Sequence, residues 1–350
     1  MPPIDVMIIE TPTPQRAPVL ERLKRIASQP LRVYFLYDHD SGRGWGNLDA
    51  GSATVVRSAR DVWRLLRDLT SADLGVVCLF GYRGWLRVLA AVITRLRRAP
   101  LVLRSDSNTK DEEERPRWRR LAKRVYLRLL LGDPEIWTIG TNNARYWSAL
   151  GFHRQVRIPY VVPVPPARSD REAALLGPVL HDDFVVGYVG RLHPTKGIDD
   201  LIRAWASFRA EVPESEVALL ICGSGEVDGR VGEYAATETT CHSLGALSHA
   251  ELGSVYARCD IVVVPSRGPE AWGLVVNEAL AYGARVIASD RVGAADDLVE
   301  EANGQRFPAG DVPALVRCLH AEHARGRGRV TPPPLPDVAA MMHERLRAHR

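Results

Sequence analysis

The chain has 350 residues, of which 46% are hydrophobic and 25% charged. This balance excludes disordered and fibrous classes, and a prior of about 150 residues per domain predicts two domains. The longest apolar stretches, such as 88–93, are far shorter than the ~20 residues of a spanning helix. The N-terminus lacks the basic region of a secretory signal, and the five cysteines form no CxxC pair. We therefore expect a cytoplasmic protein without a spanning helix.

Charge is distributed unevenly along the sequence. Residues 1–168 hold 28 Lys and Arg against 16 Asp and Glu, a net charge of +12. The remaining residues hold 18 against 26, a net charge of −8. We expect the first part to present a basic face to an anionic acceptor or to the inner face of the membrane.

Apolar runs alternate with helix-like stretches in the first half of the chain. Strands are expected at 4–9, 31–37, 74–80, 101–104 and 136–139, and helices at 19–27, 85–98 and 117–131. Such alternation is typical of a parallel sheet covered by helices. Four prolines within 158–166 forbid a helix interior or a central strand there, so the first Rossmann-like domain is expected to cover 1–163.

A second series follows, with strands expected at 184–189, 217–222, 261–265 and 285–289 and helices at 198–210 and 273–282. It predicts a second Rossmann-like domain over 164–335. A helix within 336–350 could return to the first domain. Domains of this α/β class bind ligands at the carboxyl ends of their strands.

Two loops of the second half contain residues suited to an anionic ligand. Positions 190–197 read GRLHPTKG, and Arg191 offers forked donors while Lys196 offers a compact charge, a pair that can neutralise a diphosphate. The alternative is a basic loop that is merely solvated. Gly225, in a Gly-Ser-Gly triplet after an expected strand, is a candidate for close ligand approach or simply part of a turn.

Two carboxylates lie eight positions apart further along, at Glu270 and Glu278. Glu278, inside the expected helix, could accept two hydrogen bonds from a ribose diol, and Glu270 could contact a sugar. The amides of Gly273, Leu274 and Val275 would begin that helix and suit an anionic leaving group. The alternative is a chance spacing of two Glu.

Together these segments resemble the family 4 retaining glycosyltransferases of the GT-B fold, whose marks are a G-R-L-x-x-x-K-G loop and two Glu separated by seven residues. The resemblance covers roughly 184–315 and includes Pro265-Ser266. It implies a second domain that binds a nucleotide-diphosphate sugar across from an acceptor domain. Arg191 and Lys196 would then contact the diphosphate, Glu270 the sugar and Glu278 the ribose.

The first domain matches this family less specifically. Segments 104–108 and 138–143 resemble a bacterial subgroup that shares the W-G-L-V-V-N-E form seen at 272–278. Asp106, just past an expected strand, is the candidate for contact with the transferred sugar or the acceptor hydroxyl; alternatively it caps a helix or turn. Arg285 stands where members usually carry Pro and is expected to alter only a turn. Asp38-His39-Asp40 forms the D-x-D mark of the GT-A fold, but we interpret it as a turn.

The sequence therefore predicts a retaining, metal-independent transferase of the hexosyl type. It would use a nucleotide-diphosphate sugar as co-substrate, with no further cofactor and no nucleic-acid partner, in envelope polysaccharide, glycolipid or natural-product synthesis. The alternatives are a nucleotide-sugar epimerase and a non-catalytic binder of anionic glycolipid or polymer. The expected catalytic residues are Asp106, Arg191, Lys196 and Glu270, and the expected donor-binding residues are Gly190, Gly225, Gly273, Leu274, Val275 and Glu278.

The expected helix at 117–131 is basic and amphipathic. Its apolar stripe consists of Trp118, Leu121, Val125 and Leu129, with Arg and Lys at other positions around the helix. Two interpretations stay open. The stripe packs on the sheet and the Arg face is solvated, or the helix meets an anionic membrane surface that holds a lipid-linked acceptor.

Overall fold

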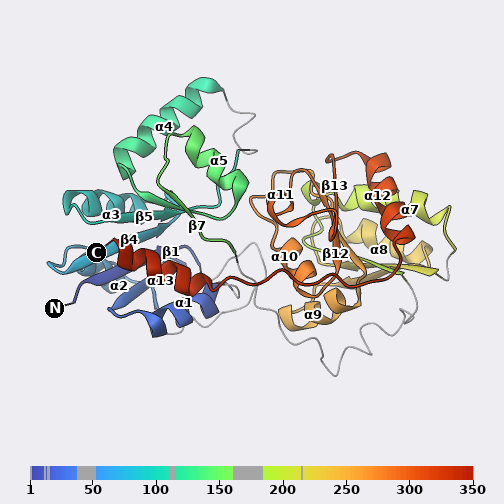
Figure 1. Cartoon of the computed structure of the whole chain (residues 1–350), viewed down its shortest axis with the longest axis horizontal. Helices are drawn as coiled ribbons and strands as arrows, with labels where there is room; N and C mark the ends of the chain where they lie inside the picture. Colours follow the sequence, from blue (N-terminus) through green and yellow to red (C-terminus); the bar gives the residue numbers. More distant parts are fainter. Residues whose placement is uncertain are drawn as a thin grey trace. The chain divides into compact units, whose positions relative to one another are not determined.

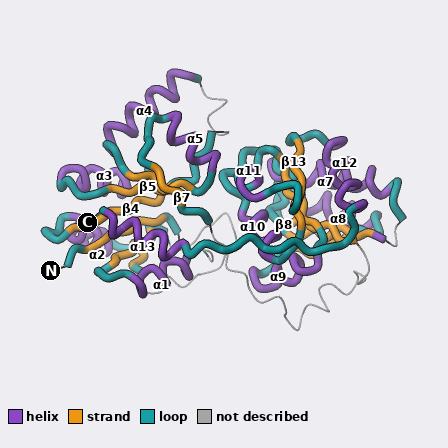
Figure 2. The backbone as a smooth tube through the Cα atoms, in the orientation of Figure 1, coloured by secondary structure: helices purple, strands orange, loops and turns teal. Residues whose placement is uncertain are grey.

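The computed structural model describes residues 2–11, 13, 16–37, 53–109, 116–160, 184–213 and 216–349. The chain forms two compact units, Met1–Pro163 with Leu335–Arg350, and Val164–Pro334. Each unit is built on its own parallel sheet, drawn as arrows in Figure 1 and in orange in Figure 2. The Asp38-His39-Asp40 triplet lies outside the described residues.

The first unit holds a seven-stranded sheet in the order β3-β2-β1-β4-β5-β6-β7. Its elements are β1 (Ile4–Ile9), α1 (Arg16–Ile26), β2 (Leu31–Phe35), β3 (Thr54–Val55), α2 (Ala59–Leu69), β4 (Leu74–Phe80), α3 (Trp85–Leu96), β5 (Leu101–Arg104), α4 (Arg117–Leu131), β6 (Glu135–Thr138), α5 (Thr141–Ala149), β7 (Gln155–Arg157) and α13 (Val338–Ala348).

Helices cover both faces of this sheet. Side chains of α2, α3, α4 and α5 pack in one buried cluster, and those of α1 and α13 pack in the other. The final helix, red in Figure 1, contributes Met342 and Leu346 to that second cluster. An ion pair from Arg345 to the buried Glu135 of β6 joins α13 to the sheet. The C-terminal segment is thus part of the first unit's core.

The second unit holds a six-stranded sheet in the order β10-β9-β8-β11-β12-β13. Its elements are β8 (Phe184–Val189), the 3-10 turn η1 (Pro194–Lys196), α7 (Ile198–Arg209), β9 (Val217–Cys222), α8 (Asp228–Thr237), β10 (Cys241–Gly245), α9 (His249–Arg258), β11 (Ile261–Val264), α10 (Leu274–Ala281), β12 (Arg285–Ser289), α11 (Ala295–Leu298), β13 (Gly304–Phe307) and α12 (Val312–Ala324).

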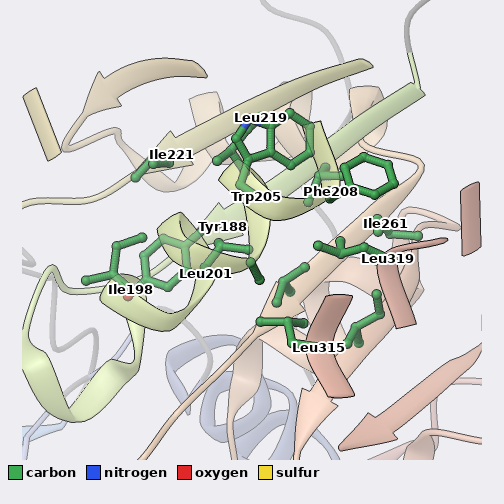
Figure 3. Close-up of a cluster of buried hydrophobic side chains, with 14 of the residues drawn as sticks. Tyr188, Ile198, Leu201, Trp205, Phe208, Leu219, Ile221, Ile261, Leu315 and Leu319 are labelled. Atoms are coloured by element: carbon green, nitrogen blue, oxygen red, sulfur yellow. The ribbon is translucent and has the colours of Figure 1, made fainter. Parts of the chain in front are cut away.

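The core of the second unit is built from aromatic and aliphatic side chains. Figure 3 shows Trp205 and Phe208 of α7 beside Leu219 of β9, with Leu315 and Leu319 of α12 in the same cluster. The helices α9 and α10 contact the strands β8, β11 and β12. This packing fixes the loops that leave the carboxyl ends of β8, β9 and β11.

Arg285 does more than alter a turn, so that expectation was wrong. It is buried at the start of β12, and its Nε lies 2.6 Å from the carboxylate of Glu322 on α12. Its Nη2 also donates to the carbonyls of Glu322 and Gly326, at 3.2 and 2.7 Å. Because a buried charge is tolerated only when it is paired and hydrogen-bonded, Arg285 ties β12 to α12 in a way that Pro could not.

In the part of the chain that the structure describes, no helix is both long and apolar enough to cross a bilayer. All five cysteines are buried and form no disulfide.

Candidate functional site

Two loops of the second unit are bonded together at the carboxyl edge of its sheet. The carbonyl of Thr195 accepts hydrogen bonds from the amides of Arg267 and Gly268, both at 2.9 Å. Gly197 has a φ of +72°, and a Cβ at this position would lie 1.9 Å from the carbonyl oxygen of Pro265. Only glycine allows so close a backbone approach. The 190–197 loop therefore lies directly on the loop after β11.

This contact brings Lys196 to Glu270. The Lys196 Nζ lies 2.8 Å from Oε1 of Glu270, and the Ser266 hydroxyl donates to Oε2 at 2.7 Å. The side chains of Lys196 and Glu270 are 29% and 18% exposed, so the pair is shielded yet reachable. Residues 74 positions apart thus form one charged cluster, as expected if both serve a single ligand.

Glu270 stands beside the start of α10. A Cβ placed on Gly273 would be 3.6 Å from Cδ of Glu270. Gly273 is the N-cap of α10 with a φ of +96°, and no side chain caps this end. The first amides of α10, from Gly273 to Val275, are therefore donors without a capping acceptor, and the helix dipole adds positive potential there. Such a helix start suits a phosphate oxygen.

Arg191 is exposed, and its guanidinium forms no hydrogen bond or ion pair with the described residues. Its backbone is held because the Tyr188 hydroxyl donates to the Arg191 carbonyl at 2.9 Å. The carbonyl of Gly190, the neighbouring residue, lies so near the next loop that a Cβ on Gly223 would approach it to 1.8 Å. The amide of Gly225 donates to Asp228 at 2.8 Å, so it does not offer a hydrogen bond to a ligand.

Glu278 lies on the buried side of α10, apart from the Lys196 contacts. The Tyr256 hydroxyl donates to its Oε2 at 2.6 Å, and burial raises the pKa of Glu278. Its Oε1 accepts no hydrogen bond from any described residue. One carboxylate oxygen is therefore positioned by α9 while the other remains available as an acceptor.

Asp106 of the first unit follows β5 and is half exposed. Tyr160 donates its hydroxyl hydrogen to Oδ1 at 2.6 Å, and Arg16 lies 4.0 Å from Oδ2. Among the described residues, this carboxylate is bonded by side chains and accepts no hydrogen bond from a backbone amide. The side chain of Asn143 donates to the carbonyl of Ser105 at 2.8 Å and also to that of Ser107.

Sequence analysis assigned no role to the residues that position these groups. Ser266 lies in a segment quoted for the resemblance, and so does Asn143, but neither was distinguished from its neighbours. Tyr160 falls in a Pro-rich stretch that was interpreted only as a domain boundary. Asn143 and Tyr160 had no local signal, because their partners lie 36 to 38 and 54 positions away. Ser266 lies only four positions from Glu270, but no motif marked its hydroxyl as a donor to that carboxylate.

The apolar stripe of α4 does not pack on the sheet, so that interpretation was wrong. The four side chains expected there are between 50% and 72% exposed; they are Trp118, Leu121, Val125 and Leu129. The helix instead buries Leu127, Leu130 and Leu131.

A comparison with known families matches residues 177–320 to the family "Glycosyl transferases group 1". This range contains the whole Lys196–Glu270 cluster and Glu278. The matched residues all lie within the second unit.

Curated relatives align over part of this chain. D-inositol 3-phosphate glycosyltransferase of Corynebacterium glutamicum (strain R) is 40% identical over 172 residues, covering 46% of this chain and 40% of that protein. Lipopolysaccharide 1,2-N-acetylglucosaminetransferase of Salmonella typhimurium is 32% identical over 136 residues, covering 37% of this chain and 35% of that protein. The chain spans less than half the length of the relatives it matches.

Solved structures are similar over both units. Anabaena Alr3699/HepE in complex with UDP and glucose has a TM-score of 0.66 at 18% identity, covering 99% of this chain and 96% of that one. A glycosyltransferase from Rickettsia africae ESF-5 has a TM-score of 0.71 at 14% identity, covering 99% and 93%. The predicted fold class, two Rossmann-like units of the GT-B type, is confirmed.

Proposed function

We propose that this protein is a retaining glycosyltransferase of family 4 that moves a sugar from a nucleotide-diphosphate sugar to an acceptor hydroxyl. The observation that carries the proposal is the Lys196–Glu270 ion pair beside the uncapped start of α10, within a glycosyltransferase group 1 domain. A cation and free helix amides match the diphosphate of such a donor, on which charge grows as it leaves, and a carboxylate in the same place matches the sugar hydroxyls.

Each donor group has a matching group in the second unit. Arg191, whose guanidinium has no partner among the described residues, and Lys196 bind the diphosphate, and Glu270 orients the sugar. The free oxygen of Glu278 accepts hydrogen bonds from the ribose. The UDP and UDP-glucose complexes of Anabaena Alr3699/HepE support a donor of this class.

The chemical step follows from charge. The bond between the anomeric carbon and the diphosphate oxygen breaks, and negative charge grows on the diphosphate. Lys196, Arg191 and the amides at the start of α10 stabilise that charge. The acceptor oxygen forms the new bond on the same face, and its proton passes to the departing phosphate oxygen, which retains the configuration. Asp106 orients the acceptor hydroxyl or the transferred sugar from the first unit.

In this proposal, sugar transfer proceeds without a divalent metal ion. Guanidinium, ammonium and helix amides supply the positive potential that a metal ion supplies in other transferases. The sugar of the donor and the position of the new linkage are set by side chains that contact the sugar and the acceptor.

The exposed face of α4 supports a further part of the proposal, peripheral binding to the inner face of the membrane. Five large apolar side chains are exposed on this helix, namely the four of the stripe and Tyr126, and its sequence carries six Arg and Lys residues from Arg117 to Arg128. Apolar side chains can enter the headgroup region while each basic group gains about 1 kcal/mol near anionic lipid. A membrane-bound enzyme of this kind would meet a lipid-linked acceptor.

A thermal-shift screen of nucleoside diphosphates and their sugars tests the donor assignment. A ligand at 100 times its Kd stabilises the folded state by about 2.7 kcal/mol, which is readily measured as a rise in Tm. We expect at least one nucleoside diphosphate to raise the Tm of the wild type, and to raise that of Lys196→Ala less. No shift with any of them would contradict the proposed donor class.

A further inference from the structure

A cavity of about 300 Å³ lies at the carboxyl edge of the first unit's sheet. Its walls come from the residues after β2 and β3 and from the first turns of α2 and α3, helices of the first unit in Figure 1. Leu36, Val56 and Val62 supply apolar surface, and Arg87 supplies a cation. None of the residues assigned to the donor lies here.

Arg87 is buried without a full set of partners. It is 5% exposed, and its Nη1 donates to the carbonyl of Arg83 at 2.9 Å. Its Nε and Nη2 are also buried, but neither donates a hydrogen bond to any described residue. The nearest carboxylate, that of the largely exposed Glu10, is 3.9 Å from Nη2, too far for a hydrogen bond.

This arrangement is costly unless an acceptor enters. An unpaired donor that is shielded from water loses its hydration without compensation, and the loss is greatest for a charged group. Burial lowers the pKa of Arg87 for the same reason, while the nearby Glu10 opposes the shift. An anion at the two free nitrogens would remove the penalty.

The start of α3 offers further donors at the same place. α3 has twelve residues, and its N-cap is Gly84 with a φ of +89° and no side-chain cap. Arg87 is the third residue of this helix, so its side chain and the uncapped amides of Trp85 and Leu86 belong to one helical turn. By contrast, Ser58 and Asp61 form a capping box at α2, which satisfies the other helix start in the cavity.

We propose that this cavity is a phosphate subsite, in which Arg87 and the first amides of α3 bind the phosphate group of a phosphorylated acceptor. A forked guanidinium and helix amides match the oxygens of a phosphomonoester. The apolar walls hold the organic part of the ligand, and the exposed Trp85 also lines the cavity. Calling the ligand an acceptor rests on the proposed transferase function, whereas the phosphate subsite does not.

Calorimetric titration without any nucleotide tests the subsite. Glycerol 3-phosphate is the soluble probe, and phosphatidylcholine vesicles with and without phosphatidic acid present the same phosphomonoester on a lipid. We expect the wild type to bind glycerol 3-phosphate, Arg87→Gln to bind it at least tenfold more weakly, and Arg83→Gln to match the wild type. Arg83 is the matched control, because it is exposed in the same loop.

Binding to phosphatidic acid vesicles alone, lost in Arg87→Gln, would assign the phosphate to a lipid. Equal affinity of wild type and Arg87→Gln, or no binding of either probe by the wild type, would overturn the inference. If Arg87→Gln does not fold, Arg87→Lys replaces it, because Lys keeps the charge but lacks the paired donors of the guanidinium. The same loss of affinity for glycerol 3-phosphate is expected of Arg87→Lys. A nucleoside diphosphate should still raise the Tm of Arg87→Gln, so failure of the subsite is distinguishable from failure of the donor assignment.

Discussion

Replacing Lys196 with Ala is expected to lower turnover at least about 100-fold while the protein remains folded. Lys196 lies in the 190–197 loop, and its ammonium group is 2.8 Å from Glu270. The substitution removes the charge proposed to stabilise the departing diphosphate. It also leaves Glu270 without its cation, next to the start of α10.

The structure separates the catalytic effect from a folding effect. A 100-fold loss corresponds to about 2.7 kcal/mol in the transition state. The ion pair is 29% and 18% exposed, and a pair that retains solvent contact contributes about 1 kcal/mol or less to stability. The substitution leaves Ser266, which donates a hydrogen bond to Glu270 at 2.7 Å, unchanged. The loss of transition-state stabilisation should therefore clearly exceed the loss of folding stability: turnover falls about 100-fold, while the Tm changes little.

The assay follows release of nucleoside diphosphate from the donor that the thermal-shift screen identifies. Arg230→Ala is the matched control, because Arg230 forms an exposed ion pair with Asp199 at 3.3 Å in the same unit. It should turn over at the wild-type rate. Near-wild-type turnover in a folded Lys196→Ala would refute the assignment of Lys196 to the diphosphate.

Four further results are expected. Glu278→Gln should raise the KM for the donor at least about tenfold with little change in kcat, because the substitution removes a charged acceptor of ribose hydrogen bonds. An unchanged KM would contradict the assignment of Glu278 to the ribose. EDTA should leave transfer intact, and transfer that disappears and returns with magnesium or manganese would contradict the metal-free step. The protein should co-sediment with anionic but not with neutral vesicles. Less protein should co-sediment with anionic vesicles at high salt, or when Arg117→Glu and Arg120→Glu are combined. No binding to anionic vesicles would argue for a soluble acceptor. Glu135→Gln should lower the Tm at neutral pH. Burial raises the pKa of Glu135, but the His349 ring at 3.4 Å and the hydrogen bonds from Arg345 and Trp137 outweigh burial and hold it at about 2, so the Tm difference should shrink as the pH falls from about 4.5 through about 2. A difference that persists at pH 2 would show another cause.

The strands that sequence analysis identified are those inside the sheets. All four strands that it missed are sheet edges: β3 and β7 in the first unit, β10 and β13 in the second. Inner strands of a parallel sheet are buried on both faces and read as apolar runs, as in Phe184–Val189. An edge strand has a neighbour on one side only, and β10, with the sequence CHSLG, carries polar residues that hide it.

The residues of the Lys196–Glu270 cluster could be singled out because each lies in a motif that is local in sequence. The exposed surface of α4 could not be predicted in this way. Periodicity marks two apolar stripes on that helix, one through Trp118 and Leu121, the other through Leu127, Leu130 and Leu131. Tertiary packing selects the second, and no pattern within the helix states which stripe the sheet will cover. The same holds for Arg87, which lines a cavity together with residues from two other segments.

The anomeric configuration of the released sugar tests the central claim most directly. With water as the acceptor hydroxyl, the full chain and its donor should yield free sugar, and proton NMR can read its anomer before mutarotation. The account predicts that the first product has the donor's anomeric configuration and that Lys196→Ala forms it far more slowly. Initial release of the opposite anomer, or an epimerised nucleotide sugar in place of free sugar, would contradict it.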